Sequence, residues 1–474
     1  MHTSNIPSKA LILKEKFINS VGLPFREVLP ESKIQEYLDV LKIKYRRRLF
    51  DPFVTIWAFL SQVLDTDKSC HNAVSRVISW LASENVEVPS QDTGGYCQAR
   101  RKLPEKLFAL LFESVANSLN EQVTAEHLWC GRQVKVIDGS TVSMPDTCEN
   151  QKVYPQPSSQ RLGCGFPIAK IGVLFSLVTG AVVAVAIDIL NVHDLNLARQ
   201  LYASLAEGDV LVGDRAFCSY VDFILIQNRK ADAVFRKHQG RDNSERRRDK
   251  RVGPNDKFVT WFKPKTCPSS LSKEEFATLP KALVLREVQY YIVIPGFRTK
   301  HVKLITTLLD VDKYPLLKLM ELYEKRWQVE VNLKHLKTTL GMDILRSKTP
   351  SMVRKEIYTF FLGYNLLRTL MWEAGTAYDV PPLQLSLQGT RHHWNNFIPQ
   401  LLAASPKSRH KLYLSLLVLI VHKLVPERPG RVEPRVRKRR PKSYPLMQQP
   451  RSVLRHARHH KSSGEPTASL RSHP

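Results

Sequence analysis

Residues 323–337 read YEKRWQVEVNLKHLK, and this segment guides the interpretation of the whole chain. Five polar residues recur in it at steps of 3, 4, 4 and 3: Tyr323, Arg326, Glu330, Lys334 and Lys337. At about 100° per residue, their side chains fall within an arc of roughly 80° on an α-helix. The helix would present one carboxylate among a phenol, a guanidinium and two ammonium groups, which suits a metal ligand beside a phosphodiester backbone.

An apolar stripe runs beside the polar one. Its members follow the same helical spacing and predict one buried side: Val329, Leu333, Leu336 and Leu340. The ordinary alternative is a solvated helix face. Charged pairs four residues apart, such as Arg326 and Glu330, stabilise such a face by only about 0.2–0.5 kcal/mol each.

The composition indicates a globular protein with a polyanionic partner. The chain has 474 residues, 43% of them hydrophobic, and a net charge of +27. Residues 427–474 contain 13 Lys/Arg against 3 acids, so this tail carries +10 and the remaining residues carry +17. A field of this sign favours nucleic acid or an anionic membrane face.

Several features predict a cytoplasmic protein without a membrane partner. Seven cysteines form no CxxC pair and no zinc spacing, which is typical of reduced thiols. The N-terminus lacks the apolar core of a signal peptide. Residues 171–190 are nearly apolar, but their β-branched content, the central Thr179-Gly180 pair and Asp188 favour two buried strands joined by a tight turn.

Hydrophobic periodicity predicts an α/β fold with helical ends. Residues 1–130 read as a helical N-terminal DNA-binding domain, with helices over 53–64, 73–81 and 105–119. Strands follow at 134–137 and within 170–190. The pattern then alternates: a helix at 195–205, a strand at 209–212, a helix at 217–227 and a strand at 231–235. This order indicates a mixed sheet covered on both faces.

The second half of the chain returns from strands to helices. Strand-like runs at 258–262, 282–288, 290–294 and 302–308 predict a β-rich insertion over residues 238–308. Helices over 314–331 and 355–372 complete a core made of residues 131–237 and 309–372. Residues 373–426 read as a helical C-terminal region, and the basic tail 427–474 is predicted to hold little fixed structure.

A second basic segment lies near the N-terminus. Residues 93–102, TGGYCQARRK, predict a short helix that carries Arg100, Arg101 and Lys102. Such a helix is a candidate for docking on DNA. The alternative is a solvated helix face without a partner.

Two aspartates each follow a predicted buried strand. Asp138 follows VKVI and Asp214 follows VLVG. The carboxyl ends of strands are where open α/β sheets place their ligands. The alternative for each residue is an aspartate that caps a turn or the next helix.

The two aspartates and Glu330 together form a candidate metal site. Carboxylate oxygens from two strand ends and one helix suit Mg²⁺ or Mn²⁺. Two such ions, about 3.5–4 Å apart, can activate an attacking oxygen and stabilise a leaving oxygen at phosphorus. A glycosidase pair of acids is the less suitable alternative because of the strong positive charge.

These motifs resemble the DDE transposases of bacterial insertion sequences that carry the Y-R-E-K signature, often called the IS-four family. The resemblance rests on Asp138 in IDGS, Asp214 in GDRAF and the spacing from Tyr323 to Lys337, and it covers roughly residues 40–445. The Y-R-E-K spacing is specific, whereas each aspartate motif alone is weak.

The resemblance implies a ribonuclease H-like catalytic core and cut-and-paste DNA transposition. It implies that Asp138, Asp214 and Glu330 bind the metal ions and that Tyr323, Arg326, Lys334 and Lys337 hold phosphates at the transposon end. It further implies a homodimer bound to inverted repeats and target DNA. Some relatives stack a flipped base on a tryptophan of the insertion, for which Trp261 is the candidate here. Its alternative is a strand-core aromatic.

Two other functions remain open from the sequence. The basic surface and N-terminal helices also fit a DNA-binding regulator or architectural protein without catalysis. The three acids also fit a ribonuclease H-like nuclease that does not join ends.

Overall fold

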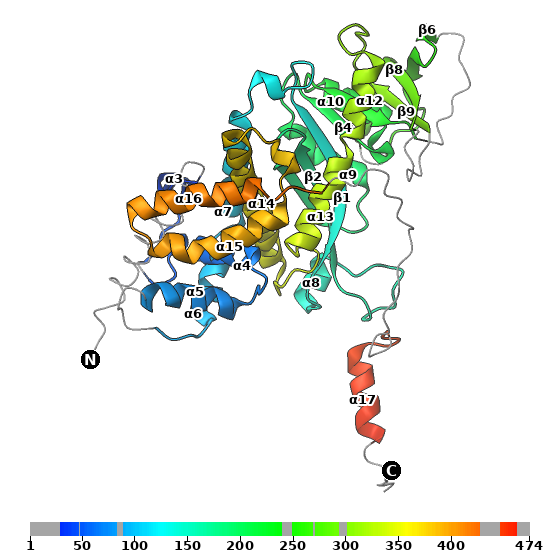
Figure 1. The fold of residues 1–474 in the computed structure, drawn as a ribbon. Coiled ribbons are helices and arrows are strands. Elements are labelled where there is room, and N and C mark those ends of the chain that lie inside the picture. The colour runs from blue at the N-terminus through cyan, green and yellow to red at the C-terminus, as the bar shows by residue number, and fades with distance from the viewer. Residues whose placement is uncertain are drawn as a thin grey trace, which may run out of the picture.

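The computed structural model of the chain describes residues 29–46, 48–82, 89–238, 249–268, 271–292, 301–426 and 446–461 (Figure 1). Within them a helical N-terminal part precedes a large mixed sheet, and further helices follow it. The N-terminal helices are α3 (Glu31–Val40), α4 (Pro52–Leu64), α5 (Cys70–Ala82), α6 (Gly94–Lys102) and α7 (Glu105–Glu121). The helices predicted at 53–64, 73–81 and 105–119 are therefore confirmed.

The sheet begins as an antiparallel triplet. It comprises β1 (Val134–Ser143), β2 (Ile168–Ser176) and β3 (Val182–Ile189). Two strands parallel to β1 follow on its other side, β4 (Val210–Gly213) and β5 (Asp232–Arg236). The spatial order β3-β2-β1-β4-β5 is that of a ribonuclease H-like core, as predicted.

The apolar segment 171–190 forms the hairpin of β2 and β3, and Gly180 takes a left-handed φ of +69° at its turn. No helix among the described residues has the length and apolarity needed to cross a membrane.

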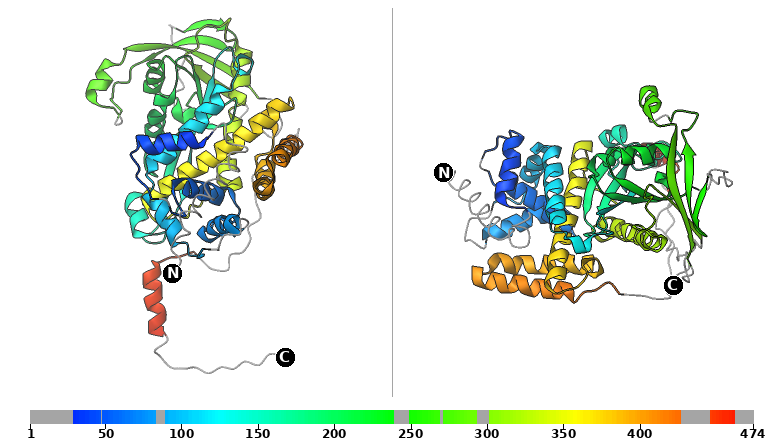
Figure 2. Two further views of the ribbon diagram at one scale, coloured as in Figure 1. Left: turned by 90° about the vertical axis from the view of Figure 1, so that its left-hand side faces the viewer. Right: turned by 90° about the horizontal axis from the view of Figure 1, so that it is seen from above.

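The strands of the predicted insertion continue the same sheet. They are β6 (Lys250–Gly253), β7 (Asp256–Phe262), β8 (Ala282–Tyr291) and β9 (His301–Thr306). Strand β9 pairs antiparallel with β5, and β8, β7 and β6 follow it outward. The sheet thus reaches nine strands, because β9 uses the edge that β5 would otherwise expose. Figure 2 shows these outer strands curving away from the helical part.

Helices cover the sheet on both faces. On one face, α9 (Asp194–Leu201) and α10 (Tyr220–Gln227) enclose an apolar cluster. The other face belongs to the main core, which also contains α12 (Leu316–Glu324), α13 (Trp327–Lys334) and α14 (Pro350–Ala377). The remaining helices are α8 (Cys148–Val153), α11 (Lys273–Thr278), α15 (Leu387–Ala403), α16 (Pro406–Val421) and α17 (Arg451–Lys461).

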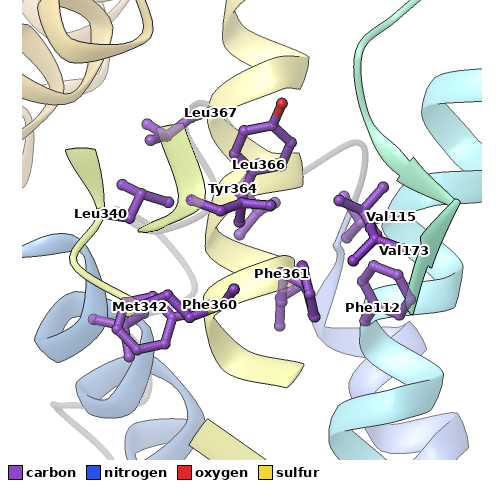
Figure 3. Close-up of a cluster of buried hydrophobic side chains, with 14 of the residues drawn as sticks. Phe112, Val115, Val173, Leu340, Met342, Phe360, Phe361, Tyr364, Leu366 and Leu367 are labelled. Atoms are coloured by element: carbon purple, nitrogen blue, oxygen red, sulfur yellow. The ribbon is translucent and has the colours of Figure 1, made fainter. Parts of the chain in front are cut away.

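Helix α14 joins the N-terminal helices to the sheet. Figure 3 shows its aromatic side chains Phe360 and Phe361 among residues of three other segments, including Phe112 of α7 and Met342. The rings of Phe112 and Phe361 lie 5.9 Å apart. Such interlocked aromatic packing fixes α14 against both parts of the molecule.

Two expectations about helices need correction. The segment 323–337 is not one continuous helix: α12 ends at Glu324, α13 begins at Trp327, and residues His335–Thr339 form a π-helical turn. The tail contains a helix, α17, where little fixed structure was expected, although residues 427–445 and 462–474 lie outside the described part.

Candidate active site

The two aspartates lie side by side where the parallel pairing of β1 with β4 ends. Asp214 directly follows β4, as expected, whereas Asp138 lies within β1, which continues to Ser143. Strands β1 and β4 pair Val136 with Val212, and this register carried on by two residues brings Asp138 level with Asp214. Neighbouring strands are about 4.8 Å apart, so the two carboxylates project from adjacent positions. The sheet therefore brings together residues that are far apart in the sequence.

Local packing explains the residues next to each acid. Asp138 is half-buried, and the Gly139 N–H donates to its Oδ1 at 2.8 Å. Gly213 ends β4 in a confined space, where a Cβ atom would lie 2.9 Å from both Ile137 and Phe235. Because only glycine fits there, β4 can approach its neighbours and place Asp214 at the edge.

Glu330 reaches the same place from helix α13, which packs against β1. Its Oε1 lies 3.3 Å from Nη2 of Arg326, one helical turn earlier. The guanidinium of Arg326 interacts electrostatically with Asp214, Glu330 and Asp138. One largely buried cation therefore interacts with all three acids that the sequence motifs singled out.

The environment of Asp138 opposes its negative charge. Burial is the main cause that raises the pKa of the Asp138 carboxyl to about 6. The nearby Glu330 and Asp214 contribute to this rise, whereas the Gly139 N–H and Arg326 oppose it. Crowded carboxylates of this kind are stabilised by a bound cation.

The three carboxylates are the kind of ligands that a hard divalent ion prefers, but they are too far apart to bind one ion together. Within the residues that the structure describes, no three His, Cys, Asp or Glu side chains are gathered closely enough to hold a metal ion. Glu330 forms an ion pair with Arg326 and does not lie beside the two aspartates as a third ligand. The carboxylates thus fit Mg²⁺ or Mn²⁺ by type and charge, while Glu330 is held by a competing partner.

The other members of the polar stripe differ in exposure. Lys334 is exposed and Lys337 is half-buried. Tyr323 is only 7% exposed, and its hydroxyl has no hydrogen-bond partner among the described residues. Burial raises the pKa of Tyr323 to about 12, so the group is a neutral phenol that can donate a hydrogen bond. The apolar stripe Val329, Leu333, Leu336 and Leu340 is buried, as predicted.

Sequence reasoning missed Arg236. Strands β4 and β5 pair Gly213 with Phe235, so Arg236 is level with Asp214. It interacts electrostatically with Tyr323 and with Tyr290 of β8, whose buried hydroxyl also has no partner in the described structure. The signal was its position directly after the predicted strand 231–235, on the same sheet edge as both aspartates.

The basic triplet of α6 does not face one way. Arg100 is only 9% exposed, lies over the rings of Phe59 and Tyr96, and donates to Gln62 Oε1 at 3.1 Å. Only Arg101 and Lys102 are exposed. The expectation that Arg100 lies on a DNA-docking face is therefore corrected: this guanidinium belongs to the N-terminal core.

Trp261 lies on β7 inside the core between the sheet and α10. It is 6% exposed, and its ring meets Phe223 edge to face at 5.8 Å. This burial matches the alternative of a strand-core aromatic, and in this arrangement the ring offers no open face to a base.

Comparison with known proteins gives several matches. The family model described as "Transposase DDE domain" matches residues 129–366. Transposase InsG for insertion sequence element IS4 of Escherichia coli (strain K12) is 24% identical over 409 residues, covering 85% of this chain and 88% of InsG. A putative transposase for insertion sequence element IS4SA of Synechocystis sp. (strain ATCC 27184 / PCC 6803 / Kazusa) is 39% identical over 62 residues, which are 13% of this chain and 18% of that protein.

Among solved structures, a piggyBac transposase synaptic complex with hairpin DNA matches with a TM-score of 0.43 and 12% identity, covering 85% of this chain and 86% of that one. At that score the likeness carries no weight for the fold. The family match is different, because it spans half of the 474 residues and includes Asp138, Asp214 and Glu330. The chain belongs to the transposase DDE domain family, which confirms the resemblance seen in its sequence motifs.

Proposed function

We propose that this DDE transposase binds the inverted repeats of an insertion sequence and catalyses metal-dependent DNA cleavage and strand transfer. The observation that carries the proposal is the convergence of Asp138, Asp214 and Glu330 on Arg326 at one sheet edge. The net charge of +27 suits a double-stranded DNA substrate in the bacterial cytoplasm.

The acids would hold Mg²⁺ or Mn²⁺. When bound, two such ions would supply activation of the attacking water or 3′-hydroxyl and stabilisation of the leaving oxygen. Asp138 and Asp214 offer two adjacent carboxylates, and Glu330 offers a third on a longer, exposed side chain.

Arg326 would make the site depend on DNA. Its guanidinium now pairs with Glu330 at 3.3 Å, and a phosphate is a strong bidentate competitor for that guanidinium. A DNA phosphate at Arg326 would release Glu330 toward the two aspartates.

The remaining cations would hold the DNA backbone around the acids. Lys334 and Lys337 follow Glu330 along the helix, and Arg236 lies beyond Asp214 on the other side. The buried hydroxyl of Tyr323 is a further donor. Arg101 and Lys102 of α6 would contact DNA away from the acids. Paired inverted repeats call for two such chains, so we propose that a homodimer acts on them.

The decisive experiment is Asp138→Asn with DNA that carries the element's own end. The variant is expected to bind the end as the wild type does and to cut no strand under Mg²⁺ or Mn²⁺. Normal cutting by this variant would refute the assignment. If the wild type binds ends but never nicks them, the DNA-binding regulator is the better function, and nicking without strand transfer would indicate the nuclease.

A further inference from the structure

A buried chain of hydrogen bonds ties helix α13 to the hairpin turn of β2 and β3. Arg368 of α14 donates from Nη2 to Oδ1 of Asn332 on α13 at 2.6 Å, and from Nε to the Tyr364 hydroxyl at 2.9 Å. Tyr364 in turn donates to the Gly180 carbonyl at 2.8 Å. Within α13 itself, Gln328 also donates to Asn332 Oδ1 at 3.3 Å, which orients the Asn332 side chain. Helix α13 is therefore held by directional bonds as well as by apolar packing.

Arg368, the cation of these hydrogen bonds, is unusual because it is buried without an acidic partner in the described part of the chain. Arg368 is 1% exposed, and no described carboxylate lies within ion-pair distance of it. Burying a guanidinium without a counter-charge costs several kcal/mol in general, and an apolar side chain of similar size is often the more stable choice. Stability alone therefore gives no reason for an arginine here.

The surroundings leave little freedom for Arg368 to move. A Cβ atom on Gly180 would lie 3.1 Å from its Cζ and 2.9 Å from Leu383. Gly180 also has a φ of +69°, which other residues rarely adopt. The hairpin turn thus approaches the guanidinium closely and fixes the far end of the hydrogen-bond chain.

Asn332 lies two residues after Glu330, so the two side chains leave α13 about 200° apart. A rotation of α13 about its axis would break the bond to Arg368 and turn Glu330 and Arg326 away from the aspartates. We propose that Asn332 and Arg368 are positioning residues that fix the rotation of α13 and thereby aim Glu330. The proposal rests on the proposed function of Glu330, while the restraint on α13 is testable without it.

Full-length Arg368→Met and Asn332→Leu test the proposal together with their double variant. Each single change leaves buried polar groups without partners and is expected to destabilise the fold. The double variant replaces both by apolar groups and is expected to recover the thermal midpoint of the wild type. It is still expected to show faster hydrogen exchange over residues 327–334 and DNA-end cleavage reduced about 10–100-fold, as for other residues that orient a ligand.

Arg354→Met is the matched control, because Arg354 lies on the same helix and pairs with Glu105 instead of α13. It should leave exchange over 327–334 unchanged. A double variant with wild-type exchange and wild-type cleavage would overturn the proposal and leave Arg368 a merely structural residue. Failure of the proposed function has a different outcome: Glu330→Gln would cleave like the wild type, whatever the exchange at α13 shows.

Discussion

Two basic segments, α6 and the α12–α13 region, were both expected to contact DNA, and the structure uses their arginines differently. Arg100 of α6 lies over two aromatic rings in the N-terminal core and bonds to an amide and thiols. Arg326 lies among three carboxylates at a sheet edge. Both guanidinium groups are largely buried, so the difference comes from their neighbours. A run of basic residues marks a candidate surface, but only its packing shows which cations face outward.

The largest expected effect is on the rate of DNA-end cleavage, which should depend on Arg326 and not on Arg100. Arg326→Ala should lower the rate of end cleavage by about 10²–10³-fold, because the site would lose the cation that we propose binds the DNA phosphate. The rate is measured in single turnover with saturating enzyme. Arg100→Ala, compared at a temperature where it is folded, should cleave at nearly the wild-type rate. Equal losses in both variants would mean that Arg326 has no role in cleavage that Arg100 lacks.

The next effect concerns stability. Arg100→Ala should lower the free energy of unfolding by about 2–4 kcal/mol, because it empties space between Phe59 and Tyr96 and removes the donor to Gln62. Urea unfolding of the full chain measures it. The neighbouring exposed Arg101→Ala is the control and should change stability by no more than about 0.5 kcal/mol. A neutral Arg100→Ala would mean that this guanidinium is not part of the core.

The effect of Asp138→Asn on the stability of the fold should depend on pH. The ordinary pKa of Asp138, 3.8, rises to about 6 in the fold, so the folded chain holds this proton more tightly than the unfolded chain does. The stability that it contributes is present at low pH and is lost as pH rises from about 4 to about 6. In divalent-free buffer, Asp138→Asn should therefore gain stability over the wild type across that window and keep the gain up to pH 7.5. Urea midpoints at half-unit pH steps measure it, and a constant difference would contradict the raised pKa.

The smallest effect concerns salt. Lys337→Ala should weaken end binding and reduce the slope of log K against log salt by about 0.9, the value for one lost phosphate contact on duplex DNA. Binding titrations from 50 to 200 mM salt, in EDTA to prevent cleavage, give the slope. Lys102→Ala tests α6 in the same way, and Arg100→Ala should leave the slope unchanged. An unaltered slope for Lys337→Ala would exclude a direct contact by that residue.

Much of the fold was predictable because its strands and helices carry strong local patterns. The segments around Asp138 and Asp214 read as buried strands ending at an acid. Strand β4 ends at Gly213 as expected, but β1 continues through Asp138 to Ser143, because β2 pairs with it along that length. The insertion was recognised as β-rich, but its attachment to β5 was not, because strand pairing depends on register between distant segments. Arg236 was missed for the same reason.

The helix break near Arg326 also escaped prediction. Residues 323–337 have unbroken helical periodicity, yet the winding tightens to i→i+3 hydrogen bonds at Lys325 and Arg326 and widens into a π-helical turn at His335–Thr339. This places Tyr323 on a different helix from Glu330. Hydrophobic periodicity shows which face of a helix is apolar. It does not show where tertiary packing tightens or widens the winding of that helix.

The sequence by itself determined the family and the mixed α/β class, and it singled out three candidate acids, because motif spacing and hydrophobic period are local properties of the chain. Tertiary structure decided which cations are outward, which lie in the core and how α13 is held. Those outcomes depend on contacts such as Arg368 to Asn332 and Arg100 to Phe59, between residues that no local pattern links. Packing and burial act between segments distant in sequence, so only the folded chain reveals their result.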